Sequence, residues 1–248
     1  MGMKYSIPFL CMALIASVCA AVELTIFANE EYRPVSYKDQ HGMASGVASE
    51  IIKRHELRTG DKIKLEMSSW RRAYELALKG QGGIIGLSKT KERLSLFDYS
   101  EPVYDVIVTV VVKKGKEFPF RSVNDLKGKL VGMTNGASYG AEFNAALEAH
   151  LFSADFNYLS AARFKKLLHG RVDCVVFGGG QQGLLQALNS DPELLANQDQ
   201  FVILEHPLIY DPVYLGFHKS MNMKPFLNAF NKTIKEAKNT GILPKTKN

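Results

Sequence analysis

The sequence is poor in cysteine, and this limits its disulfide chemistry. It has 3 cysteines in 248 residues. Cys11 and Cys19 fall in an N-terminal segment that we expect to be removed, which leaves Cys174 alone. An intramolecular disulfide is therefore excluded in the mature chain, even in an oxidising compartment. Cys174 lies in the apolar run 174–177, so we expect a small buried side chain rather than a reactive thiol.

Dense basic runs and motifs for metals or catalysis are also missing. The formal net charge is +6, but no run of Lys and Arg is long enough to suggest a nucleic-acid partner. The histidines show no spacing typical of metal ligands, and no Gly-x-Ser-x-Gly element occurs. The glycines at 178–180 lack the ending of a phosphate-binding loop. We expect no metal, no cofactor and no catalytic residue.

Beyond the N-terminus, no apolar run is long enough to cross a membrane. Lys4 precedes the apolar residues 7–18, and small residues follow at 19–21. This pattern predicts a secretory signal peptide over 1–21 and a periplasmic location. The run, of about a dozen residues, is too short for a stable span. The residues before Cys19 match a lipidation motif poorly, so we expect ordinary cleavage rather than a lipid anchor.

The rest of the chain has an ordinary globular composition, with 46% apolar and 23% charged residues. Hydrophobic periodicity predicts strands at 23–28, 63–67, 84–85, 106–112, 130–133, 174–177, 201–204 and 214–217. It predicts helices at 47–57, 70–79, 139–151, 161–169, 181–189 and 225–240. Strands that alternate with helices predict an α/β fold with parallel strands and right-handed crossovers.

No linker rich in Gly or Pro separates the first strand–helix series from the second. The junction is instead the β-branched run 106–112, the clearest strand in the sequence. We therefore expect two lobes that share backbone rather than two domains on a flexible tether.

A polar motif follows the predicted strand 84–85. It reads Gly-Leu-Ser-Lys-Thr-Lys-Glu-Arg over 86–93, and Phe-Asp-Tyr-Ser-Glu-Pro-Val-Tyr follows over 97–104. Arg93 offers a planar fork of donors that suits a carboxylate. Ser88 follows the end of a strand, where open α/β sheets hold their ligands. Taken alone, Arg93 would fit a surface ion pair with Glu92 or Glu101 better than a ligand site, and only its place in the motif favours the site.

The chain resembles the bacterial extracellular solute-binding proteins of the polar amino-acid type. The stretch 86–93 looks like the family's small-x-Ser-x-Thr-x-x-Arg signature, and 97–104 looks like its trailing Phe-Ser-x-Pro-x-Tyr element. Further matches lie at 32–34, 42–46, 125–129, 136–138 and 170–173. In this order and spacing, the matches cover essentially the whole mature chain.

The resemblance implies the periplasmic-binding-protein-like type II fold: two α/β lobes joined by two crossover strands, with a ligand cleft between them. After the signal peptide, lobe 1 is expected at 22–105 and 207–248, and lobe 2 at 106–206. The hinge is expected near 104–106 and 206–210. We expect a monomer.

The resemblance also implies the site. The family's matches to Arg93 and Ser88 hold the ligand's carboxylate, and the match to Ser138 clamps it from lobe 2. The matches to Tyr32 and Trp70 are aromatic walls. The expected ligand-binding residues are Tyr32, Trp70, Gly86, Ser88, Arg93, Ala137, Ser138 and Gly178.

At one position the sequence departs from the family. The acid that binds the ligand's α-amino group in the family is replaced here by Gly178. A buried ammonium without a paired acid is costly. Either Glu30, Glu142 or Asp211 serves instead, or the ligand lacks that group. Asn29 stands where many members carry another acid.

The sequence thus predicts a binding protein that performs no chemistry. It would capture a small polar carboxylate, such as an amino acid or a relative, for a membrane ABC permease. One alternative is a ligand sensor that docks on a membrane signalling receptor. Another is an enzyme resembling periplasmic cyclohexadienyl dehydratases, with Glu142 as the general acid.

Overall fold

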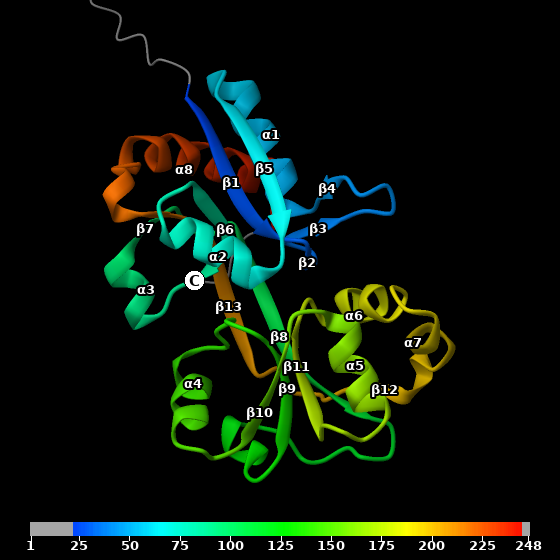
Figure 1. Cartoon of the computed structure of the whole chain (residues 1–248). Helices are drawn as coiled ribbons and strands as arrows, with labels where there is room; N and C mark the ends of the chain where they lie inside the picture. Colours follow the sequence, from blue (N-terminus) through cyan, green and yellow to red (C-terminus); the bar gives the residue numbers. More distant parts are fainter. Residues whose placement is uncertain (1–21, 245–248) are drawn as a thin grey trace, which may run out of the picture.

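The computed structural model describes residues 22–244, which form two α/β lobes joined by two long strands (Figure 1). The predicted signal peptide and Cys19 lie outside the described residues. Within 22–244, every helix is too short or too polar to cross a bilayer.

The first lobe is built around a parallel group of strands. Its elements are β1 (Glu23–Asn29), α1 (Val47–Thr59), β5 (Lys62–Ser68), α2 (Trp70–Leu78) and β6 (Gly83–Ser88). Strand β1 pairs in parallel with both β5 and β6. All five elements were predicted, four from an apolar period and β6 from its short apolar run at 84–85. Gly60 ends α1 with a left-handed φ of 80°.

Short elements of the first lobe escaped prediction. A small antiparallel sheet consists of β2 (Glu31–Tyr32), β3 (Ser36–Lys38) and β4 (Ala44–Ser45). After β6 follow α3 (Lys91–Leu96) and β7 (Phe97–Tyr99). These strands are too short to show a period of two.

The second lobe repeats the strand–helix alternation. It contains β8 (Tyr104–Lys113), β9 (Leu130–Thr134), α4 (Ala141–Glu148), β10 (Ser153–Asn157), α5 (Ser160–Leu168), β11 (Cys174–Gly178), α6 (Gly180–Leu188), α7 (Pro192–Ala196) and β12 (Phe201–Ile203), with single 3-10 turns η1 (Val123–Leu126) and η2 (Gln198–Gln200). Strand β9 pairs in parallel with β10 and β11. Cys174 is fully buried on β11, as predicted, and burial raises the pKa of its thiol to about 12.

The chain then returns to the first lobe through β13 (Ile209–His218), η3 (Lys219–Met221) and α8 (Lys224–Asn239). Strand β13 pairs with β8 over Ile209–Val213 and with β6 beyond that, while β8 also pairs with β11. These two antiparallel strands are the crossovers, and they confirm the expected fold class. Strand β13 begins at Ile209, five residues before the predicted 214.

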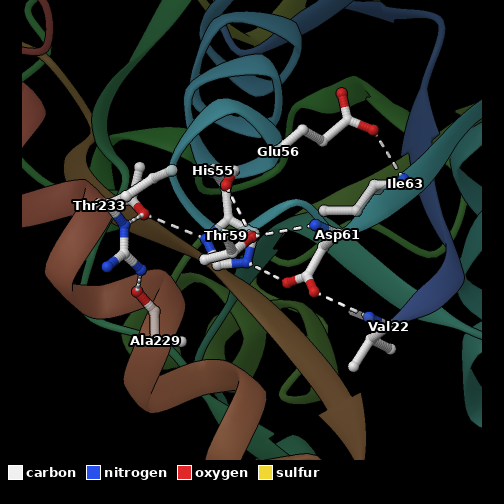
Figure 2. A network of polar contacts seen from close by, with 9 residues as sticks. Val22, His55, Glu56, Thr59, Asp61, Ile63, Ala229 and Thr233 are labelled. Atoms are coloured by element: carbon white, nitrogen blue, oxygen red, sulfur yellow. Dashed lines mark hydrogen bonds and ion pairs between the residues drawn. The ribbon is translucent and has the colours of Figure 1, made fainter. Parts of the chain in front are cut away.

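A buried polar network fastens α8 to the first lobe (Figure 2). His55 is fully buried on α1, and its Nε2 lies 2.9 Å from Oδ2 of Asp61. Its Nδ1 lies 3.1 Å from Oγ1 of Thr233 on α8, which also accepts a hydrogen bond from Arg58. Asp61 accepts a further bond from the backbone of Val22 at the start of the described chain. Burial lowers the pKa of His55, although the Asp61 carboxylate opposes this shift.

This burial predicts an acid-sensitive fold. Because the pKa of His55 is lower in the folded than in the unfolded chain, its contribution to stability is present above about pH 6.5 and is lost as the pH falls below it. Acidification from about pH 7.5 to about pH 5.5 should therefore lower the free energy of unfolding of the native chain more than it lowers that of the His55→Gln variant, as measured by urea unfolding. The same pH dependence in both proteins would contradict the prediction.

Candidate functional site

One cavity between the lobes is lined by every predicted ligand-binding residue. These are Tyr32, Trp70, Gly86, Ser88, Arg93, Ala137, Ser138 and Gly178. The cavity has a volume of about 60 Å³, and a single water molecule needs roughly 10–15 Å³ of volume measured in this way. The cavity therefore suits a small molecule.

Arg93 points into the space between the lobes and is only 6% exposed. Thr90 caps α3 by accepting a hydrogen bond from the backbone N–H of Arg93, which fixes where this side chain begins. The guanidinium donates to the carbonyl of Ser88 at 3.3 Å and to the carbonyl of Gly136 in the second lobe at 3.2 Å. Within residues 22–244 it forms no ion pair with a carboxylate. The surface ion pair considered for Arg93 is therefore absent from this part of the chain.

Of the three candidate acids, Asp211 on β13 is the one that lies beside the motif 86–93. Its Oδ2 accepts a hydrogen bond of 2.5 Å from the hydroxyl of Ser88. The Asp211 side chain is buried, and burial raises its pKa to about 6, although Ser88 and Arg93 both act to lower it. The cavity thus holds a fixed cation together with an acid whose pKa burial raises to about 6.

The two other candidate acids lie elsewhere. Glu30 forms an ion pair of 2.5 Å with Lys38 and does not line the cavity. Glu142 is exposed in the first turn of α4 and does not line it either. The hypothesis of Glu142 as a general acid in the cleft is therefore wrong.

The ring of Tyr32 explains why a glycine occupies position 178. A Cβ atom added to Gly178 would lie 3.2 Å from Cε2 of Tyr32 and 3.0 Å from Cγ1 of Val106. On the opposite side, a Cβ atom at Gly86 would lie 3.3 Å from Cδ1 of the same ring, and Gly86 has a left-handed φ of 87°. A side chain at position 178 would therefore press against the Tyr32 ring and Val106.

Trp70 and Ser138 approach the cavity from opposite lobes. The indole Nε1 of Trp70 donates to the carbonyl of Gly136 at 2.9 Å, so this buried aromatic bridges the lobes. Ser138 precedes Gly140, the N-cap of α4, and its hydroxyl accepts a hydrogen bond of 2.9 Å from Asn144. Helix α4 begins at Ala141, two residues after the predicted 139. Residues 137–138 therefore lie in the loop that faces the cavity.

Polar contacts between the lobes continue around the cavity. The guanidinium of Arg71 donates to the hydroxyl of Tyr158 at 3.1 Å, and Glu31 accepts a 2.9 Å hydrogen bond from the backbone of Ser160. Together with the bonds to Gly136, they hold the lobes in a closed arrangement.

Several cavity residues were not identified from the sequence. They include Glu31, Val108, Thr134, Tyr139, Tyr158, Ser160, Arg163, Val176 and Phe177. Most lie on the second lobe, where single polar residues in helices and strand ends form no motif. Arg163, within an amphipathic helix pattern, gives the same signal as a solvated arginine.

Comparison with solved structures shows the same fold in proteins of low sequence identity. A histidine kinase sensor domain with similarity to periplasmic binding proteins has a TM-score of 0.75 at 15% identity, covering 90% of this chain and 92% of that one. An ancestral arginine-binding protein bound to glutamine has a TM-score of 0.72 at 23% identity, covering 90% and 94%. An amino acid ABC transporter substrate-binding protein from Streptococcus pneumoniae, bound to L-arginine, has a TM-score of 0.68 at 24% identity, covering 88% and 90%.

Sequence comparison places the chain in a family. No curated protein sequence matches it. A family model, however, matches residues 24–248, almost the entire chain that follows the predicted signal peptide. The chain belongs to the bacterial extracellular solute-binding proteins, family 3.

Proposed function

We propose that this protein captures a small carboxylate-bearing molecule, an amino acid or a close relative, in the periplasm and delivers it to a membrane ABC permease. The observation that carries the proposal is Arg93: a buried cation that lines the cavity and has no carboxylate partner in the described chain. A buried charge without a partner is costly, so a ligand carboxylate would relieve an existing penalty.

In the proposed complex, Arg93 and Ser88 hold the carboxylate from the first lobe, and the single Ser88 hydroxyl proton turns from Asp211 to the ligand. Ser138 and the backbone of the 137–138 loop hold it from the second lobe. The ligand favours closure because only the closed state brings both sets of donors to it. The proposed lobes are 22–105 with 207–248, and 106–206, and the crossover strands bend near 104–106 and 206–210. The protein acts as a monomer.

Asp211 is proposed to take the role of the acid that Gly178 lacks. Its carboxylate lies within hydrogen-bonding distance of Ser88, so it lies beside the atoms proposed to hold the ligand carboxylate. An α-amino acid carries its ammonium one carbon away from its carboxylate. A charge-assisted bond between that ammonium and Asp211 therefore fits the site.

The single tryptophan allows a direct test of ligand capture. Because the Trp70 indole bonds to Gly136 across the cavity, ligand binding is expected to change its environment. Titration of the purified chain with a panel of amino acids, keto acids and dicarboxylates should give a saturable change in tryptophan fluorescence for the true ligand. The bound protein should also melt at a higher temperature.

Uncharged molecules of the same size, such as polyols, serve as the control panel. A saturable response to polyols with none to any carboxylate would contradict the proposal.

A second candidate function is ligand sensing for a membrane receptor. The observation that favours it is the shared fold with a histidine kinase sensor domain. The two outputs separate by partner: a transport protein in the closed state stimulates uptake through a permease, whereas a sensor changes the activity of a kinase.

A further inference from the structure

A second arginine lies in the cavity, on the opposite lobe from Arg93. Arg163 projects from α5 and is only 3% exposed, although it carries a charge. It lines the same cavity as Arg93 and Asp211. Arginines are seldom this deeply buried unless they are paired.

The partners of Arg163 are neutral and leave part of its guanidinium unused. One terminal nitrogen donates to the hydroxyl of Thr134 at 2.5 Å, and the other donates to the hydroxyl of Ser160 at 3.1 Å. Its Nε is buried and has no hydrogen-bond partner in the described chain. Nor does Arg163 form an ion pair with any carboxylate among residues 22–244.

The cavity also holds acids, but they are engaged elsewhere. Glu31 accepts a hydrogen bond from the backbone of Ser160, and Asp211 accepts one from Ser88. Burial lowers the pKa of Arg163, while Tyr139 and Glu31 act in the opposite direction. A guanidinium nevertheless stays charged at neutral pH. A cation held by two hydroxyl groups, with an unused N–H, is a built site for an oxyanion.

We propose that Arg163, with Thr134 and Ser160, forms a second oxyanion subsite, and that the ligand is a small acidic molecule with two carboxylates, such as an acidic amino acid. This inference rests on the proposed function, because it assumes that Arg93 holds the first carboxylate. The charges then complement one another: Arg93 and Arg163 each meet a carboxylate, Asp211 meets the ammonium, and Glu31 keeps its bond to the backbone N–H of Ser160.

The inference separates this chain from proteins that bind a cationic amino acid. A ligand side chain carrying a guanidinium would share the cavity with the unpaired charge of Arg163. Asn29 also lines the cavity and supplies no negative charge, and Glu31 is already bonded to the backbone N–H of Ser160. Arginine, the ligand of one structural neighbour, should therefore bind this chain weakly.

The test compares ligands that differ in one charge. Calorimetry at about pH 7.5 should show that L-glutamate or L-aspartate binds at least about tenfold more tightly than its amide, L-glutamine or L-asparagine, and more tightly than L-arginine. Arg163→Gln should remove this preference while the amide still binds. The exposed Arg171→Gln in the same lobe is the matched control and should keep the preference.

The outcomes also separate this inference from the proposed function. A purely structural role for Arg163 would lower the melting temperature of Arg163→Gln without changing the ratio of acid to amide affinity. That result, or equal binding of acid and amide by the native chain, would overturn the inference. The proposed function would still stand if binding required Arg93. Binding of none of these probes would also overturn the inference, and the wider carboxylate panel then decides the proposed function alone.

Discussion

Replacing Arg93 with glutamine is expected to weaken ligand binding at least about thirtyfold, which corresponds to about 2 kcal/mol or more. Glutamine is shorter than arginine and carries no charge, so it can neither neutralise a carboxylate nor reach the carbonyls of both Ser88 and Gly136, which the guanidinium contacts now. The expected loss therefore combines the bond to the ligand carboxylate with the bond from Arg93 to the second lobe. Calorimetry with the ligand found in the fluorescence screen measures it.

The matched control is Arg72→Gln, which removes the same charge from an exposed position on α2. It should bind as the native chain does. Circular dichroism and melting temperature show whether Arg93→Gln remains folded, and Arg93→Lys offers a second variant that keeps the charge. Unchanged affinity in a folded Arg93→Gln protein would exclude a carboxylate at this position.

Replacing Asp211 with asparagine is expected to weaken the binding of an α-amino acid by about tenfold or more at about pH 7.5 and to remove its pH dependence. The pKa of Asp211 in the ligand-free protein is about 6. A ligand ammonium stabilises the ionised carboxylate, so binding near this pH releases a proton. Affinity should therefore fall as the pH is lowered from about 7.5 to about 5.5.

Calorimetry in buffers of different ionisation enthalpy measures the released proton. Glu142→Gln is the control, because it removes an exposed acid outside the cavity and should leave both affinity and pH dependence unchanged. Affinity that rises on acidification would show that the ligand prefers the neutral form of Asp211. The ligand would then lack an ammonium, and the role given to Asp211 would be wrong.

The sequence predicted the elements with strong periodicity and the motif whose spacing carries chemistry. Strand β8 is a run of β-branched residues, and α1 has an apolar face that ends at Gly60, so local preference and final structure agree. The motif 86–93 placed Ser88 at a strand end, and in the structure Arg93 follows one helical turn after the cap at Thr90. This local geometry directs both groups into the cavity.

Long-range packing decided what the sequence could not show. Asp211 was one of three candidate acids, and only the pairing of β13 with β6 and β8 brings it to Ser88. Arg163 has the pattern of a solvated helix residue, but the fold buries it against Thr134 and Ser160. Gly178 was noticed as a missing acid, but the side chains that crowd this position, Val106 and Tyr32, lie far away in the sequence.

The most direct test of the central claim removes the charge from the ligand rather than from the protein. We would measure, by calorimetry, the affinity of the native chain and of Arg93→Gln for the ligand and for its α-carboxamide. The native chain should bind the carboxamide at least about thirtyfold more weakly, and Arg93→Gln should bind both molecules alike. If the native chain binds acid and carboxamide equally well, Arg93 does not hold a carboxylate.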